Sequence, residues 1–177
     1  MQLFFVLNRI ISRGGGDMAE KLFAGITFEQ AVRKYSDTVT GVCVMRLHNS
    51  ADAEDCFQNV FFKLYYKSPD FKSDDHLKAW LIRVSIHECT SYMRKFRRQI
   101  PVDSLHNEIT DDTDNLDISW ALMKTPPKYR DVLYLHYCEQ YKVKEIAEIL
   151  SIKENTVKSL LKRGREILKS LYGGDNA

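Results

Sequence analysis

The stretch EIAEILSIKENTVKSLLKRGREIL, residues 145–168, predicts two amphipathic helices joined by a short corner. Its apolar residues recur at helical spacing on both sides of the corner: Ile146, Ala147 and Leu150 before it, and Ile152, Val157 and Leu160 or Leu161 after it. Two helices that pack across each other need apolar inner faces, and a small residue such as Ala147 allows a close crossing. The stretch therefore indicates a helix-turn-helix.

The corner and the second helix carry polar signals of their own. Ser151 and Glu154 match the S-x-x-E capping box, which would start the second helix at this point. From Lys153 to Lys169, six basic residues stand against two acids. A helix in the major groove presents donors to base edges from its first turns and basic side chains to phosphates further along. The composition favours DNA binding, and a merely solvated basic face is the alternative.

Three longer amphipathic helices are expected upstream, each with an apolar face that recurs at helical spacing. They occupy approximately residues 27–47, 48–67 and 77–98. Thr27 is the expected N-cap of the first, and Ser50 or Asp52 that of the second, whose first-turn acids complement the helix dipole. A cluster of Pro, Ser and Asp at residues 68–76 marks the break before the third.

An acidic segment separates these helices from the C-terminal ones. No Lys or Arg occurs from Gln99 to Met123, although both flanks are basic and the net charge of the chain is only +2. The segment contains six acids: Asp103, Glu108, Asp111, Asp112, Asp114 and Asp117. Such a composition predicts a solvated linker, and the basic flanks favour a polyanionic partner. Helices resume near Ile118, and Thr125 is the expected cap of the next one, with prolines in its first turn.

No segment shows the alternation of a strand, so we expect an all-α fold of two small helical domains joined by an acidic linker. The expected division is an N-terminal extension or leader (1–25), a helical bundle (26–99), the linker (100–116) and the helix-turn-helix domain (117–177).

The N-terminal segment MQLFFVLNRII is apolar but too short to span a bilayer, and it lacks the basic start and cleavage site of a signal peptide. The following RGGGDM would be encoded by a purine-rich, ribosome-binding-like tract just before Met18. We therefore hypothesise that translation starts at Met18, which would make residues 1–17 a leader or an artefact. The alternative is an additional helix that packs on the domain.

The four cysteines are scattered without a C-x-x-C pair, which predicts a reducing cytoplasm and buried thiols rather than disulfides. His87 with Cys89, and His136 with Cys138, lie two residues apart and so point to nearly opposite helix faces. We expect no metal site and no cofactor. The sequence also has no P-loop, H-E-x-x-H motif or nucleophile elbow that would indicate an enzyme.

Three segments together resemble bacterial RNA polymerase sigma factors of the extracytoplasmic-function type. DAEDCFQNVFFKLY (52–65) is similar to the family segment that docks on the polymerase clamp. FKSDDHLKAWLIRVSIHECTSYMRK (71–95) is similar to the promoter-melting segment, and PPKYRDVLYLHYCEQYKVKEIAEILSIKENTVKSLLKRGR (126–165) to the fourth region. The order and separation of the segments also agree, and the resemblance covers approximately residues 28–172.

The resemblance implies three sets of contact residues, which we call the clamp set, the −10 set and the −35 set. The clamp set, for core polymerase, is Asp52, Glu54, Asp55, Gln58, Asn59 and Phe62. The −10 set, for melted promoter DNA, is Phe71, Lys72, Ser73, Trp80, Arg83 and His87. The −35 set, for duplex DNA, is Thr156, Lys158, Ser159, Lys162, Arg163 and Arg165. Acids of the clamp set can also serve helix stability, and Trp80 can equally be a core anchor.

Three residues depart from the family pattern. His87 stands where the family commonly has Asn, and neutral His offers one donor and one acceptor on a ring. Ser151 replaces the usual Gly of the turn, and Lys153 replaces a small capping residue.

The resemblance implies a cytoplasmic protein whose partners are core RNA polymerase, promoter DNA and an anti-sigma factor, with no direct insertion into a membrane. Its acidic linker would pass through the polymerase toward the RNA path. Two other interpretations are a conventional helix-turn-helix regulator that acts without polymerase, and a helical adaptor whose basic helix meets an acidic protein.

Overall fold

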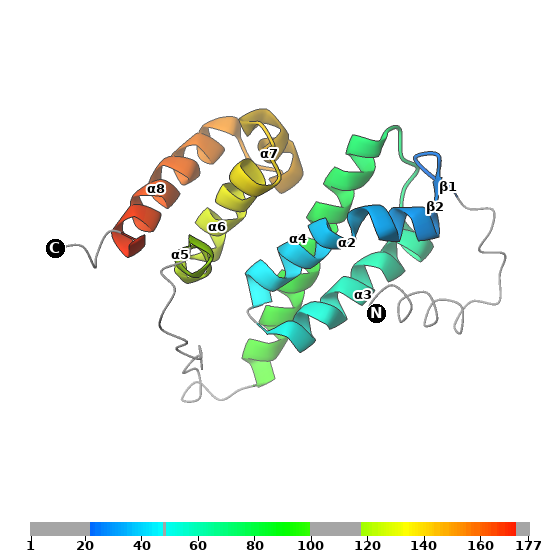
Figure 1. Ribbon diagram of the computed structural model, residues 1–177, viewed down its shortest axis with the longest axis horizontal. Helices are drawn as coiled ribbons and strands as arrows, with labels where there is room; N and C mark the ends of the chain where they lie inside the picture. The colour runs from blue at the N-terminus through cyan, green and yellow to red at the C-terminus, as the bar shows by residue number, and fades with distance from the viewer. Residues whose placement is uncertain (1–21, 48, 100–117, 173–177) are drawn as a thin grey trace. The chain divides into compact units, whose positions relative to one another are not determined.

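The computed structural model of the chain describes residues 22–47, 49–99 and 118–172 (Figure 1). The chain divides into two compact units between Gln99 and Ile100. Apart from one two-stranded hairpin, the regular elements of the described residues are helices, which confirms the all-α prediction. The expected leader at residues 1–17 and the acidic linker lie outside the described residues.

The first unit is a bundle of three helices in mutual contact: α2 (Phe28–Leu47), α3 (Ser50–Lys67) and α4 (Asp74–Gln99) (Figure 1). Its core contains aromatic and aliphatic side chains from all three, among them Phe57, Phe61 and Leu81. The rings of Phe57 and Phe61 lie 4.9 Å apart, centroid to centroid, in an edge-on arrangement. Burial of these faces is what the helical periodicity of the sequence predicts.

A hairpin of β1 (Leu22–Phe23) and β2 (Ile26–Thr27) precedes the bundle. Ala24 and Gly25 both have positive φ, 53° and 86°, as a type I′ hairpin turn requires. The turn directs Phe23 into the core, where its ring centroid lies 6.0 Å from that of Phe28. Residues 22–25 thus pack with the bundle.

The helix starts of the first unit show which N-cap predictions hold. Thr27 Oγ1 accepts from the Gln30 amide at 3.3 Å, and Gln30 Oε1 accepts from the Thr27 amide at 2.9 Å, so the predicted cap of α2 is confirmed. The prediction for α3 was wrong, because Asn49 rather than Ser50 or Asp52 is the cap. Its Oδ1 accepts from the amides of residues 51 and 52, at 2.9 and 3.4 Å.

The third helix begins earlier than predicted. It starts at Asp74, three residues before Leu77, because Ser73 Oγ accepts a hydrogen bond from the His76 amide at 3.1 Å and thereby caps it. The break between α3 and α4 is correspondingly shorter than the composition of residues 68–76 indicates.

The second unit contains α5 (Ile118–Lys124), α6 (Pro127–Leu133), the π-helical turn η2 (Tyr134–Cys138), α7 (Val143–Leu150) and α8 (Glu154–Tyr172). Contacts join α8 to α5, α6 and α7. The predicted inner faces of the helix-turn-helix are buried at Ile146, Ala147 and Val157. Of the two alternatives for the second helix, Leu161 is buried and Leu160 is half-buried.

Thr125 does not cap α6, contrary to prediction. The helix has Pro126 at its N-cap and Pro127 at its first position, which confirms the expected role of the prolines. Thr125 is instead buried at the end of α5, where its hydroxyl donates to the carbonyl of Ala121 at 2.9 Å. Its own carbonyl accepts from Arg130 Nε at 3.1 Å.

The corner of the helix-turn-helix also differs from the predicted capping box. Ser151 ends α7 in the left-handed conformation (φ 56°, ψ 44°), and α8 begins only at Glu154. The Ile152 amide donates to the Ala147 carbonyl at 3.0 Å, and the Ser151 amide to the Glu148 carbonyl at 3.4 Å. This pair of bonds is a Schellman motif, so Ser151 terminates the first helix rather than starting the second.

Candidate nucleic-acid interface

Helix α8 separates an apolar face from a row of exposed polar side chains. Val157, Leu161 and Gly164 are buried at helical spacing and face the rest of the unit. All six residues of the −35 set are exposed: Thr156, Lys158, Ser159, Lys162, Arg163 and Arg165. The structure therefore presents this set to solvent along the outer part of one helix.

Gly164 allows α8 to approach α6 closely. A Cβ at this position would lie 3.0 Å from Leu133 Cδ1 and 3.1 Å from its Cγ, closer than ordinary van der Waals contact. Leu133 is itself buried, so a larger residue would have to displace a core side chain. The glycine between Arg163 and Arg165 thus sets the packing of the helix that carries them.

Two tyrosines lie beside the basic side chains of α8. Arg165 Nη1 donates to the Tyr137 hydroxyl at 3.3 Å. The pKa of Tyr129 on α6 lies below its usual value, chiefly because of Lys128 and additionally because of Arg163. Lys128 Nζ lies 4.8 Å from the centroid of the Tyr129 ring. Sequence spacing did not indicate either tyrosine, because each meets α8 only through the tertiary fold.

An open hollow of about 430 Å³ lies at the corner between α7 and α8. It is lined by both signs of charge, including Lys144, Glu148 and Glu154, together with Ser151 and Ile152. None of the three predicted contact sets contributes to it.

The clamp set lies on α3. Glu54, Asp55 and Asn59 are exposed, whereas Asp52 and Gln58 are half-buried. Asp55 and Asn59 are four residues apart, so they share one helix face.

Two members of the clamp set make contacts within the bundle. Asp52 Oδ1 accepts from the Tyr92 hydroxyl of α4 at 2.6 Å. This contact, with smaller contributions from burial and from other nearby acidic groups, raises the pKa of Tyr92 to about 12. Phe62 packs against the core, and its ring centroid lies 4.5 Å from that of Tyr66. Asp52 and Phe62 therefore help to hold the bundle together, while the exposed members are open to a partner.

The −10 set lies around the start of α4. Lys72 and Ser73 are exposed, and Phe71 is half-buried. The Phe71 ring centroid lies 5.5 Å from that of His76 and 5.5 Å from that of Trp80, both in steep edge-on arrangements. Trp80 also packs against the core and remains half-buried, so the core-anchor interpretation holds for part of its ring.

Trp80, Arg83 and His87 follow one another at i, i+3 and i+7 along α4, which places them on one face of the helix. Arg83 and His87 are exposed. The structure thus places the −10 set on a short loop and on one face of the helix that follows this loop.

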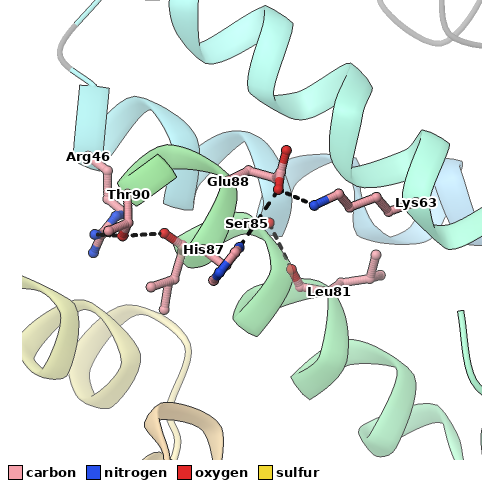
Figure 2. A network of polar contacts seen from close by, with 8 residues as sticks. Arg46, Lys63, Leu81, Ser85, His87, Glu88 and Thr90 are labelled. Atoms are coloured by element: carbon pink, nitrogen blue, oxygen red, sulfur yellow. Dashed lines mark hydrogen bonds and ion pairs between the residues drawn. The ribbon is translucent and has the colours of Figure 1, made fainter. Parts of the chain in front are cut away.

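Polar contacts fasten α4 to both neighbouring helices near His87 (Figure 2). Glu88 forms an ion pair with Lys63 of α3, and Arg46 Nη2 of α2 donates to Thr90 Oγ1 at 2.7 Å. The His87 side chain is 75% exposed and its Nδ1 lies 3.9 Å from Glu88 Oε1. His87 is therefore exposed on α4 beside these contacts.

Cys43, Cys56 and Cys89 are buried in the core of the bundle, one from each helix. A hydrogen bond with Cys89, together with burial, raises the pKa of Cys56, and a hydrogen bond with Cys43, together with burial, raises the pKa of Cys89. Cys138, at the end of η2, is exposed, so the prediction of four buried thiols was wrong for this residue. Residue spacing does not predict this exposure, because the tertiary fold decides which side chains of η2 face solvent.

Among the side chains that the structure describes, no three His, Cys, Asp or Glu residues are grouped so as to hold a metal ion. Within residues 22–47, 49–99 and 118–172, no helix is long and apolar enough to cross a membrane.

Two family descriptions match the chain, one in each unit. Sigma-70 region 2 matches residues 31–99, and Sigma-70 region 4 matches residues 121–168. The first match covers the bundle with the clamp and −10 sets, and the second covers the unit with the −35 set.

Similar proteins and structures agree with these matches. The chain is 28% identical to the ECF RNA polymerase sigma factor SigW of Bacillus subtilis (strain 168) over 162 residues, which cover 80% of this chain and 87% of SigW. It is 26% identical to SigM of the same organism, over 83% of this chain and 96% of SigM.

Among solved structures, the chain resembles the sigma factor RpoE in complex with the anti-sigma factor NepR from Bartonella quintana, with a TM-score of 0.68 and 24% identity. The likeness covers 84% of this chain and 98% of RpoE. It also resembles CnrH in complex with the cytosolic domain of CnrY, with a TM-score of 0.63 and 17% identity, over 99% of this chain and 100% of CnrH. With Sigma-70 region 2 matched in the first unit and region 4 in the second, the chain belongs to the RNA polymerase sigma factors of the extracytoplasmic-function type.

Proposed function

We propose that this chain binds core RNA polymerase and directs it to specific promoters, with the first unit reading and melting −10 DNA and the second reading −35 duplex DNA. The observation that carries the proposal is the match of regions 2 and 4 to two separate compact units, each with exposed residues from the predicted contact sets. Nucleotide transfer is the work of the polymerase, and this chain supplies recognition and strand separation.

The −10 function belongs to the loop Phe71–Ser73 and the adjacent face of α4. A flipped base needs an aromatic surface for stacking and basic groups for the strand's phosphates. Phe71 and Trp80 offer half-buried rings, and Lys72 and Arg83 offer exposed basic side chains nearby. His87 completes this face in place of the commoner Asn and would alter the −10 preference.

The −35 function belongs to α8. Lys158 and Ser159 lie in its early turns, from which a recognition helix reaches base edges, whereas Arg163 and Arg165 lie further along and grip phosphates. Tyr137 shares a hydrogen bond with Arg165 and so helps to hold that guanidinium in place.

Core polymerase binds the exposed clamp residues of α3, including Glu54, Asp55 and Asn59. The solved structure of the sigma factor RpoE is a complex with the anti-sigma factor NepR, which supports an anti-sigma partner for this chain as well. Because the protein binds RNA polymerase, it acts in the cytoplasm, where the polymerase works. Linking two weak DNA readers raises their combined affinity through effective concentration.

Run-off transcription with purified core polymerase tests the proposal. Genomic templates should yield promoter-specific products only when the chain is present, and sequencing transcripts after overexpression should reveal a shared pair of upstream elements. A conventional regulator would instead bind duplex promoter DNA without polymerase. DNA binding of that kind, with no promoter-specific product from any genomic template, would contradict the proposal.

A further inference from the structure

The first residue of α4 is held by two neighbouring residues of α2. Tyr35 Oη donates to Asp74 Oδ1 at 2.5 Å, and Lys34 Nζ lies 2.6 Å from the same oxygen. The Tyr35 hydroxyl also lies 3.4 Å from the Asp74 carbonyl oxygen. We call this group the α2–α4 clasp. Tyr35 is 2% exposed, so one arm of the clasp is anchored in the core.

The charge on Asp74 strengthens the clasp. The hydrogen bond from Lys34, and next that from Tyr35, holds the pKa of this carboxyl below its usual value. The group is therefore ionised at neutral pH, and hydrogen bonds to an ionised acceptor are stronger than those between neutral groups. Lys34 also offsets a negative charge that would otherwise stand next to the expected path of DNA.

The clasp lies immediately after the loop Phe71–Ser73. Ser73 caps α4 through the His76 amide, and its carbonyl accepts from the Leu77 amide at 3.1 Å. The Lys72 amide lies 3.4 Å from His76 Nδ1, and the Phe71 ring lies against His76. Each loop residue thus contacts the first turn of α4. The clasp holds this first turn of the helix against α2.

We propose that Asp74 is a positioning residue for promoter opening, which through Lys34 and Tyr35 holds the loop Phe71–Ser73 in the geometry that captures a base of the melted −10 strand. Asp74 does not itself contact DNA in this scheme. The inference rests on the proposed function and adds to it the residues that place the reading loop.

Two variants test the clasp, and a third is the matched control. Tyr35→Phe removes the buried donor, and Asp74→Ala removes the acceptor. Thr90→Val removes the hydrogen bond from Arg46, which joins the same two helices further along α4 (Figure 2). Thermal unfolding of each variant establishes that the bundle is folded at the assay temperature.

The assay measures how holoenzyme, assembled with core polymerase, binds a single-stranded oligonucleotide with the nontemplate −10 sequence of a promoter found by transcript sequencing. Binding of the −35 duplex and of core polymerase is measured in parallel. Tyr35→Phe and Asp74→Ala should weaken oligonucleotide binding about tenfold, as expected for a lost hydrogen bond to a charged group. Duplex and core binding should change less than twofold, and Thr90→Val should resemble the wild type throughout.

Permanganate reactivity of unpaired thymines in the promoter gives a second readout, and it should fall for the two clasp variants alone. Wild-type oligonucleotide binding by both variants would overturn the inference, as would an equal loss in Thr90→Val, since the clasp would then only stabilise the bundle. If the wild-type holoenzyme itself failed to select promoters or bind the oligonucleotide, the proposed function would fall together with this inference.

Discussion

Tyr92 and Asp52 form a hydrogen bond that stabilises the bundle next to exposed acids of the clamp set. Their hydrogen bond joins α3 to α4, while neighbouring acids of α3 remain exposed. The carboxylate accepts the phenolic proton, so loss of that proton would place two negative groups in contact. The pair therefore ties the stability of the bundle to pH.

The Tyr92 contact should stabilise the protein only while the phenol is protonated. Its pKa is raised from 10.0 to about 12, so the stabilisation is fully present below pH 10 and is lost as pH rises through about 12. We expect Tyr92→Phe to lower the free energy of unfolding by about 1 kcal/mol near neutral pH. The difference from wild type should shrink across this alkaline range. Urea unfolding of both proteins at several pH values measures it, and a constant difference would contradict the assignment.

The four cysteines should divide sharply in their reactivity. Cys43, Cys56 and Cys89 are buried, and the pKa values of Cys56 and Cys89 are raised, whereas Cys138 is exposed. A thiol reagent such as Ellman's should therefore label one thiol quickly in the folded, reduced protein and four after unfolding.

Cys138→Ser is the matched control for the labelling experiment. The variant should lose the fast phase and leave the three slow thiols unchanged. Fast labelling of any of the three remaining thiols in this variant would show that the bundle opens more readily than its packing indicates.

At the scale of elements, the helix ends depend on backbone geometry as much as on side-chain caps. Asn49 and Ser73 cap their helices through side-chain oxygens. Ser151 instead ends α7 with positive φ, where a Cβ is unfavourable and glycine fits without strain. Glycine is also the residue that the family resemblance leads one to expect there.

Ser151→Gly should stabilise the second unit by about 1 kcal/mol, because it removes the Cβ from a left-handed position. Ser151→Ala retains the Cβ and is the matched control, with stability expected to stay near that of wild type. Chemical unfolding followed by circular dichroism measures both changes. Equal stability of the glycine variant and wild type would mean that this corner carries little strain.

At the scale of the whole molecule, the chain is two units with separate cores, and the proposed function divides between them. In the second unit, Lys158 and Arg165 occupy different turns of the same exposed row. Phosphate contacts govern salt-dependent affinity, and contacts to base edges govern sequence choice. The two kinds of contact can therefore be separated by mutation.

Arg165→Ala should reduce the slope of the logarithm of −35 duplex affinity against the logarithm of salt concentration by about one unit, with base preference retained. Lys158→Ala should change the base preference. Binding titrations at several salt concentrations, on wild-type and substituted duplexes, measure both effects. Lys67→Ala, an exposed basic residue of the first unit, is the control and should leave the slope unchanged. An altered base preference with an unchanged slope for Arg165→Ala would reverse the assigned roles.

Local patterns in the sequence were enough to predict most of the helices. Apolar spacing located α2, α3, α7 and α8, because a helix that buries one face repeats its apolar residues every three to four positions. Helix ends were less predictable, as Asn49 and Ser73 show, since several polar residues near each end compete for the same orphan amides.

The sequence by itself determined the all-α class, the helix-turn-helix and the family, because these follow from local periodicity and from motifs in a set order. Only the tertiary structure decided which side chains meet across the fold. Asp74 lies 39 residues from Tyr35, Tyr92 lies 40 from Asp52, and Arg165 lies 28 from Tyr137. Local spacing carries no information on such pairs, because packing of whole helices brings them together and also decides which thiols are buried.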